Sequence, residues 1–332
     1  MRKITAIAIA LLAVYPALAQ ELGYKSFKLQ EDNRPFKVNT LFKSSEGFIY
    51  AGTTNGLYSF DGINFKRITF SKAAAKDTVT ALFEDNKHQL WAGFKNGHLA
   101  RQVNGKLEYF QPEEGTPAVA ITSFAQDRQN NLWFSTNGEG IYYFSNNHLY
   151  LIDSANGLSD LHIRTLAVTD NGDILAATDQ GINIIRNNQG PGPKKASIIG
   201  PREGLPDYYV TAITPAGNNR FWIGLQEKGI CLYDHNTGQI SVPPASLNWT
   251  YGQVNALLVA QKKLWIATED SGLVRQPAFD KAALPFFTRT NPQNKITSLL
   301  QDNEDNIWMT SPAELIATAG DRLRLLPIYD DK

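Results

Sequence analysis

The sequence is short of cysteine, and this shortage limits what can hold the fold together. Cys231 is the one cysteine in 332 residues. A single thiol cannot form an intramolecular disulfide, so an exported chain of this length has to rely on its apolar core. Cys231 lies in the apolar stretch 229–233, which predicts a buried and unreactive thiol.

Long apolar runs are also missing beyond the N-terminus. Residues 1–19 combine the basic Arg2 and Lys3, an apolar stretch and a small-residue ending at Ala19, which predicts a secretory signal peptide cleaved after Ala19. No later run reaches the roughly 18 apolar residues that a membrane span needs. We therefore expect a periplasmic or secreted chain at residues 20–332, with no membrane span and no lipid anchor.

Excess charge of one sign is absent as well. The full sequence has 32 basic and 32 acidic residues, and loss of Arg2 and Lys3 leaves 30 basic residues against 32 acidic ones. Such a balance gives no reason to expect nucleic acid or an anionic membrane as a partner.

A tryptophan-centred phrase, by contrast, returns along the chain at nearly fixed distance. Tyr50 and Leu175 occupy its central slot in two copies, and five of the six tryptophans occupy it in the others. The slot falls at positions 50, 91, 133, 175, 222, 265 and 308. A period of roughly 40–50 residues with strand-like content indicates the blades of a propeller.

Each repeat unit reads as four short strands, the first of which starts with Val or Ile. We predict an all-β fold, a single seven-bladed β-propeller of four-stranded antiparallel blades. The bulky residue in the slot is expected to fill the wedge between blades, and the small residues after it to permit close backbone approach. Residues 24–29 resemble a fourth strand without a blade, so we expect the N-terminal strand to close the ring, near residues 323–326.

The full repeat has the pattern V-x-x-L-x-x-D-x-x-G-x-L-W-x-G-T-x-x-G-L, and residues 127–141 are a close copy. It resembles the two-component regulator propeller repeats of the periplasmic sensor domains of hybrid two-component histidine kinases. Residues 156–160 and 203–207 are similar to that family's D-G-L-P-x-N lead-in. Full sensors of this kind usually carry a second propeller, a further β-domain, a membrane helix and kinase modules. We therefore expect either a stand-alone propeller or a piece of a longer sensor.

Ligands of propellers bind where loops from every blade converge at the mouth of the central channel. We expect one face to collect the loops before each first strand and the loops between second and third strands. The candidate ligand-binding residues there are Arg34, Asn137, Glu139, His162, Tyr208, Tyr209, Glu227, Trp249, Tyr251 and Glu269.

Aromatic rings beside amides and acids suit a sugar, a peptide or a protein partner. Trp249 stands out because it is the one tryptophan outside the repeat slot. The alternative interpretation is that Trp249, Tyr208 and Tyr209 only cover the edge of the ring.

Catalytic, cofactor and metal sites find no support in the sequence. No two of the five histidines lie three or four residues apart, so the spacing of a metal site is missing. Residues 302–306 resemble a calcium loop but lack its central Gly and its distant Glu, so a solvated turn is favoured. A glycosidase would need two facing carboxylates, which the sequence neither shows nor excludes.

These observations favour a non-enzymatic, exported sensor propeller that recognises a carbohydrate or related nutrient. It would signal through a partner protein or through downstream kinase domains. An envelope scaffold for protein–protein interaction is the alternative, and a propeller glycan hydrolase or lyase that uses channel acids is the least favoured.

Overall fold

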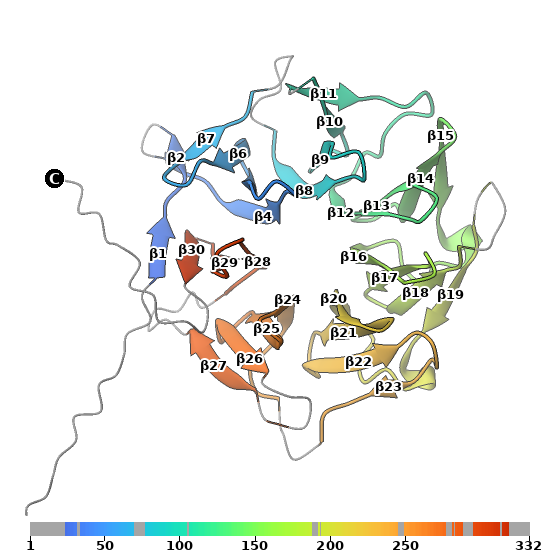
Figure 1. Cartoon of the computed structure of the whole chain (residues 1–332). Helices are drawn as coiled ribbons and strands as arrows, with labels where there is room; N and C mark the ends of the chain where they lie inside the picture. The colour runs from blue at the N-terminus through green and yellow to red at the C-terminus, as the bar shows by residue number, and fades with distance from the viewer. Residues whose placement is uncertain are drawn as a thin grey trace, which may run out of the picture.

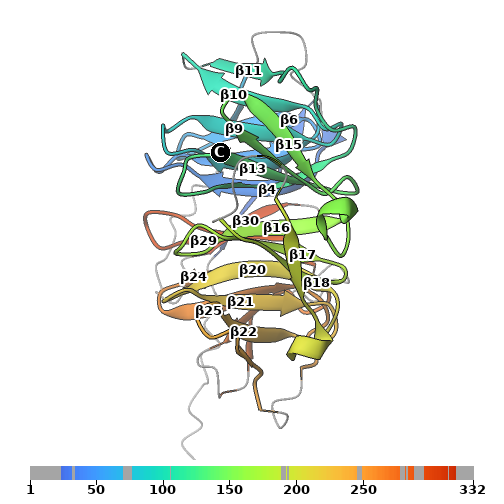
Figure 2. The same ribbon diagram turned by 90° about the vertical axis from the view of Figure 1, so that its right-hand side faces the viewer.

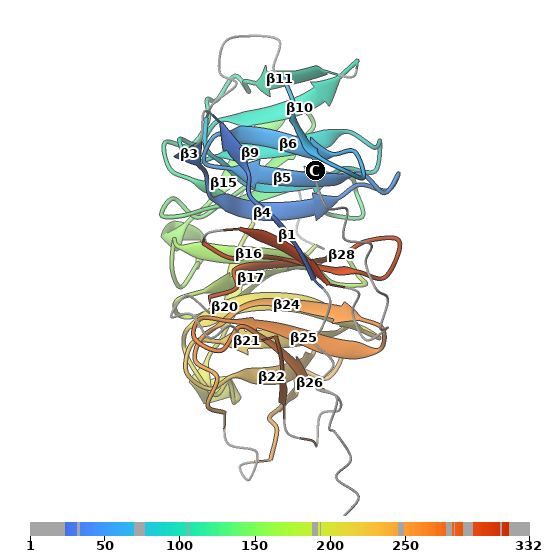
Figure 3. The same cartoon turned by 90° about the vertical axis from the view of Figure 1, so that its left-hand side faces the viewer.

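The computed structural model describes residues 24–31, 34–69, 77–104, 106–187, 192, 194–244, 249–276, 281, 283–287, 295–312 and 314–318. These residues form seven four-stranded antiparallel sheets arranged as a ring (Figure 1). Figures 2 and 3 show the ring from its two edges, with the strands running from one face to the other. The predicted all-β, seven-bladed propeller is thus confirmed. The signal peptide expected at residues 1–19 lies outside the described residues.

Each blade begins with an inner strand at the ring axis, followed by a second and a third strand toward the rim. The inner strands are β4 (Val38–Lys43), β8 (Val79–Glu84), β12 (Ile121–Gln126), β16 (Ile163–Val168), β20 (Val210–Gly217), β24 (Val254–Ala260) and β28 (Ser298–Gln301). The second strands are β5 (Ile49–Thr53), β9 (Leu90–Phe94), β13 (Leu132–Thr136), β17 (Ile174–Thr178), β21 (Arg220–Leu225), β25 (Lys263–Thr268) and β29 (Ile307–Thr310). The third strands are β6 (Gly56–Phe60), β10 (Leu99–Val103), β14 (Ile141–Ser145), β18 (Gly181–Ile185), β22 (Ile230–Asp234), β26 (Leu273–Gln276) and β30 (Leu315–Thr318).

The outer strands complete the blades. They are β7 (Phe65–Arg67), β11 (Lys106–Phe110), β15 (His148–Ile152), β19 (Ala196–Ile199), β23 (Ile240–Ser241), β27 (Leu284–Phe287) and, for the last blade, β1 (Tyr24–Phe27). A two-stranded hairpin of β2 (Gln30–Glu31) and β3 (Arg34–Pro35) leads from β1 into the first blade. Two 3-10 turns, η1 (Ser154–Asn156) and η2 (Pro201–Glu203), lead into β16 and β20.

The ring is closed by the N-terminal strand, as expected. β1 pairs antiparallel with β30, from Tyr24 opposite Thr318 to Phe27 opposite Leu315. The partner of β1 is therefore the segment 315–318, and residues 323–326, where we expected it, lie outside the described residues. Joining the first and last described strands in one blade closes the ring.

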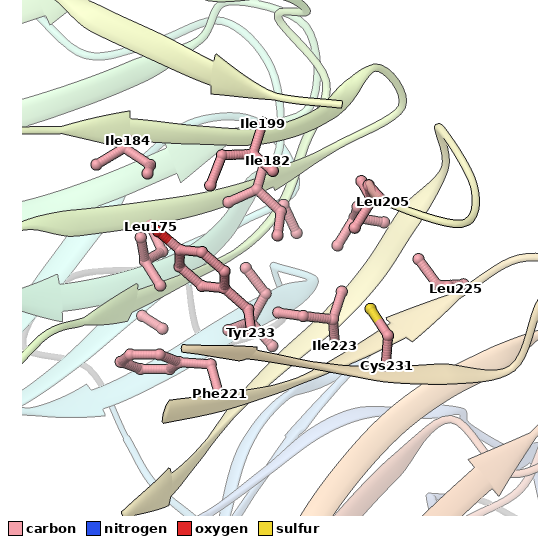
Figure 4. Close-up of a cluster of buried hydrophobic side chains, with 14 residues drawn as sticks. Leu175, Ile182, Ile184, Ile199, Leu205, Phe221, Ile223, Leu225, Cys231 and Tyr233 are labelled. Carbon is pink, nitrogen blue, oxygen red and sulfur yellow. The ribbon is translucent and has the colours of Figure 1, made fainter. Parts of the chain in front are cut away.

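The core is divided among the seams between blades. Seven clusters of buried apolar side chains are found among the described residues, and each joins two neighbouring blades. Figure 4 shows the cluster between the fourth and fifth blades, in which Leu175 and Ile182 face Ile223 and Tyr233. Cys231 belongs to this cluster, and burial raises the pKa of its thiol to about 12, as befits the unreactive thiol that we predicted.

A carboxylate in the first hairpin holds the tryptophan slot in three blades. In the third blade Asp127 Oδ1 accepts the N–H groups of Gln129 and Asn131, both at 2.9 Å, while Oδ2 accepts the Trp133 indole N–H at 2.8 Å. The same indole bond joins Trp91 to Asp85 and Trp308 to Asp302. The Asp in the repeat pattern is therefore a structural acceptor. Asp302 uses its carboxylate oxygens to accept hydrogen bonds within its own hairpin.

Small residues after the slot let the next blade approach closely. A Cβ built on Gly93 would lie 2.6 Å from side-chain atoms of Ile121, the first inner-strand residue of the following blade. Gly224 meets Val254 at the same distance. The predicted close approach is thus made by a β-branched residue of the neighbouring blade.

Candidate functional site at the mouth face

Two sets of loops meet at one face of the ring, which we call the mouth face. In five blades the first residue after the second strand donates its N–H to the carbonyl oxygen of the residue before the inner strand, as Lys95 does to Thr78 at 2.9 Å and Glu269 does to Gln253 at 2.9 Å. The described candidate residues that come after second strands or precede inner strands therefore lie on this face.

Asn137 and His162 are brought together between the third and fourth blades. They form an isolated antiparallel bridge, and the side chain of His162 is 54% exposed. Its Nδ1 lies 2.9 Å from Asp160 Oδ1, which orients the ring and leaves Nε2 toward Gly138. Asp160 comes from the lead-in phrase that also places the buried Leu158 beneath the face.

Glu139 is held by hydrogen bonds on the same side of the third blade. Its Oε2 accepts the hydroxyl of Tyr142 at 2.9 Å, and Oε1 accepts the backbone N–H of Ala118 at 3.2 Å. Burial raises the pKa of Tyr142, and the hydrogen bond and charge of Glu139 raise it further. Glu139 is thus a fixed acceptor in the described structure.

Tyr208 and Tyr209 are the most exposed aromatic pair on this face, at 54% and 42%. Asp207 positions the loop by accepting the N–H of Tyr209 at 3.2 Å and that of Glu227 at 2.9 Å. Glu227 itself is exposed. The segment therefore presents two rings and a free carboxylate to solvent.

Trp249 and Tyr251 form a packed pair rather than an open surface. Their rings meet edge to face with centroids 5.1 Å apart, and both lie against the core cluster between the fifth and sixth blades. The Trp249 indole N–H donates to Gly252 O at 2.6 Å, and its ring covers Gly229. The packing of the Trp249 ring favours the alternative interpretation, in which Trp249 covers the edge of the ring of blades.

Glu269 belongs to a polar group on the sixth blade. Lys295 Nζ lies 2.7 Å from Oε1, and Asn255 Nδ2 donates to Oε2 at 3.0 Å. Burial alone would raise the pKa of Glu269, but these two hydrogen bonds and the Lys295 charge outweigh it and lower the pKa. Arg34 lies apart from these groups in sequence, in β3, where its backbone pairs with Glu31.

Sequence reasoning missed an ion pair at the inner strand of the fourth blade. Arg164 Nε and Nη2 donate to the two carboxylate oxygens of Asp179 at 2.9 and 3.0 Å, and the Arg164 side chain is 49% exposed. Arg164 is the second residue of its inner strand and sits at a β-bulge, opposite a register shift. The same position is neutral in the other six blades, where it is occupied by Asn39, Thr80, Thr122, Thr211, Asn255 and Thr297.

This comparison between repeats was available in the sequence and would have pointed to Arg164. Its guanidinium donates to Asp179 through Nε and Nη2, and Nη1 has no hydrogen-bond partner among the described residues. A planar donor held in this way suits recognition of hydroxyl or carboxylate oxygens.

The mouth face combines aromatic surface with fixed donors and acceptors. Within the described ranges, no group of three or more His, Cys, Asp or Glu side chains is placed to hold a metal ion. In the same ranges no helix is both long and apolar enough to cross a membrane. Aromatic rings beside fixed polar groups are features that ligand-binding sites of proteins share.

Comparison with known proteins gives one family match and many structural ones. The model of the two component regulator propeller matches residues 115–138. No curated protein sequence matches the chain. The family match covers β12 and β13, the first two strands of the third blade.

Solved structures share the fold over most of this chain. The extracellular domain of BT4673 from B. thetaiotaomicron, assigned to a hybrid two component system, is 20% identical with a TM-score of 0.74, covering 92% of this chain and 40% of that one. The corresponding domain of BT3049 from the same organism is 18% identical with a TM-score of 0.70, covering 89% and 42%. Virginiamycin B lyase from Staphylococcus aureus is 14% identical with a TM-score of 0.68, covering 90% and 99%.

The chain spans about two fifths of the length of the two sensor-type domains. At these identities the likeness to each solved structure establishes the fold. The resemblance to two-component regulator propeller repeats is confirmed by the family match, in a chain whose seven blades share the fold of extracellular domains from hybrid two component systems.

Proposed function

We propose that this protein is an exported, ligand-binding sensor propeller that recognises a carbohydrate or related nutrient at its mouth face. The observation that carries the proposal is the exposed Tyr208–Tyr209 pair on a face that also holds Arg164 and Glu227. Aromatic faces pack against the C–H surface of a sugar, while charged side chains bind its hydroxyls. Signalling then passes through a partner protein or through kinase domains of a longer chain.

The repeat family and the sensor-type structural neighbours support this role, and export rests on the predicted signal peptide. N-terminal sequencing of the protein recovered from a periplasmic fraction tests the export step. We expect the mature chain to begin at Gln20. A chain recovered from the cytoplasm that retains Met1 would contradict export.

The binding step is tested by screening the mature chain against parallel glycan and peptide panels. We expect saturable binding of a glycan, and we expect Tyr208→Ala to weaken it at least tenfold because the aromatic platform is lost. Ile198→Ala is the matched control, since Ile198 is 46% exposed on the outer strand β19. Trp249 is unsuitable for this test because its ring packs on the core.

The alternatives are separated by the same screen. Binding of a peptide but of no glycan would favour an envelope interaction scaffold. Turnover of a bound glycan that disappears in Glu139→Gln or Glu269→Gln would favour a hydrolase or lyase. Glycan affinity unchanged by Tyr208→Ala would remove the mouth face as the site.

A further inference from the structure

The first blade departs from the repeat at three positions of its first hairpin. Ser44 replaces the aspartate that holds the slot in the second, third and seventh blades, and Tyr50 replaces the tryptophan. Phe48, two residues before the slot, is 50% exposed. The equivalent residue is polar in every other blade, namely Gln89, Asn131, Asp173, Arg220, Lys263 and Asn306.

A cavity of about 430 Å³ lies where these substitutions gather. It opens between the first hairpins of the first two blades, at the end of the inner strands opposite the mouth face, since Lys43 pairs with Ile49 there and Val38 pairs with Thr53 at the other end. Its size is within the range of pockets that hold small organic molecules. Ser44 and Tyr50, which replace the larger aspartate and tryptophan, both line this cavity.

The charge inside the cavity is negative. Glu46 comes from the first blade and Glu84 from the second, and none of the described residues that line the cavity is a lysine or arginine. The side chain of Glu84 is only 11% exposed, yet its carboxylate is met by the neutral Ser45, through N–H at 2.6 Å and Oγ at 2.8 Å. In the part of the chain that the structure describes, neither glutamate pairs with a lysine or arginine.

His88 also contacts the Glu84 carboxylate. Its Nδ1 lies 2.9 Å from Ser45 Oγ and 3.3 Å from Glu84 Oε1, at the wall of the cavity. The described lining therefore carries two carboxylates and, apart from His88, no basic side chain. A cation that enters the cavity is attracted by both carboxylates.

The remaining walls suit an organic cation better than a bare metal ion. Phe48 and Tyr50 contribute aromatic rings, whose faces attract ammonium and guanidinium groups. Gln102 and Asn104 contribute amide oxygens that can accept N–H groups. Burial raises the pKa of Tyr50, and the charges of Glu46 and Glu84 raise it further, so both carboxylates act at the same hydroxyl.

We propose that this cavity binds a small organic cation, with a primary ammonium or guanidinium group on a short aliphatic stem. The two carboxylates from neighbouring blades neutralise its charge, and Phe48 covers its stem. The site is separate from the mouth face, and it does not rest on the function proposed for that face.

Isothermal titration of the mature chain with agmatine, putrescine and the neutral 1,4-butanediol tests this assignment. We expect at least one of the two cations to bind saturably with one-to-one stoichiometry, and the diol not to bind. Glu46→Gln is expected to weaken cation binding at least tenfold, because it removes the charge of an exposed carboxylate that has no hydrogen-bond partner among the described residues. Phe48→Leu should weaken it severalfold by removing the aromatic face while keeping apolar bulk.

Two controls separate this site from a general charge effect and from the mouth. Glu113→Gln neutralises an exposed carboxylate elsewhere and should leave cation affinity unchanged. Tyr208→Ala should leave it unchanged while weakening glycan binding. The proposal is overturned if neither cation binds, if the diol binds equally, or if Glu46→Gln and Glu113→Gln have the same effect.

Discussion

At the scale of the residue, the repeat depends on one carboxylate and one indole. Asp127 is 4% exposed and also accepts the Asn131 side-chain amide at 2.8 Å, in addition to the two backbone groups and the Trp133 indole. Four donors thus converge on one side chain. Asp127 lies six residues before Trp133, and the hairpin between them brings the carboxylate to the indole N–H.

Replacement of Asp127 by alanine should destabilise the protein strongly. The change leaves the buried Trp133 N–H without an acceptor, and we expect a loss of about 2–4 kcal/mol in the free energy of unfolding. Urea denaturation followed by tryptophan fluorescence measures it. Arg128→Ala, an exposed change in the same turn, should cost less than about 0.5 kcal/mol. Equal losses in the two variants would show that the carboxylate is not the structural acceptor.

The fourth blade has no indole for a carboxylate to bind, because Leu175 occupies the tryptophan slot. There Asp173 binds Arg186 at 2.8 Å and lies 3.1 Å from His235 Nε2 of the next blade. Burial alone would raise the pKa of Asp173, but hydrogen bonds from the Asn187 backbone, Arg186 and His235 outweigh it and lower the pKa. This seam, which lacks the indole bond, is therefore held by other polar groups.

At the scale of the element, the small residue after the slot sets the spacing between blades. Ile121 of the next inner strand occupies the space that a side chain at Gly93 would need. A β-branched residue at the start of an inner strand cannot rotate away, since its χ1 is restricted. The pairing of a small residue with a branched one is visible in the sequence as two separate patterns, and only the packed blades show that they are complementary.

The variant Gly93→Ala should therefore be destabilised by about 1–3 kcal/mol, because its Cβ would lie 2.6 Å from Ile121. Gly200→Ala is the matched control. A Cβ there would have its nearest neighbour at 3.7 Å and no positive φ to oppose it. We expect the control to change stability by less than about 1 kcal/mol. Thermal or urea unfolding of both variants checks the difference, and a tolerated Gly93→Ala would contradict tight spacing between blades.

At the scale of the whole molecule, closure of the ring depends on an aromatic group that joins its two ends. Phe27 of β1 stacks on Trp308 with centroids 5.3 Å apart and an interplanar angle of 19°. Phe60 and Phe65 of the first blade pack edge-on against Phe27 at 5.4 and 6.0 Å. The first blade, the last blade and the N-terminal strand therefore meet in one cluster.

Phe27→Ala should weaken closure specifically, with an expected loss of about 1–3 kcal/mol in the free energy of unfolding, because the ring is half-buried. Hydrogen exchange should show faster exchange in β1 and β30 before other strands. Lys28→Ala, an exposed change at the end of the same strand, should leave both measures unchanged. Uniform acceleration across all blades in Phe27→Ala would argue against a local closure.

The number of blades, the four-strand unit and the role of the N-terminal strand could be predicted from periodicity, because each repeat encodes the same local structure. The candidate site could be predicted only as a face. Arg164, Asp160 and Asp207 were missed since they lie in repeat positions or lead-in phrases. Trp249 looked exceptional in sequence, yet its ring is occupied by packing on Gly229.

By itself the sequence determined the architecture of this protein, because alternation within strands and a fixed period between tryptophans are local properties. The tertiary structure alone decided which side chains share a space. The Arg164–Asp179 pair, the partner of β1 and the cavity between Glu46 and Glu84 all join residues that no local pattern connects. They result from the ring geometry, which brings neighbouring blades, and the strands β1 and β30, into contact.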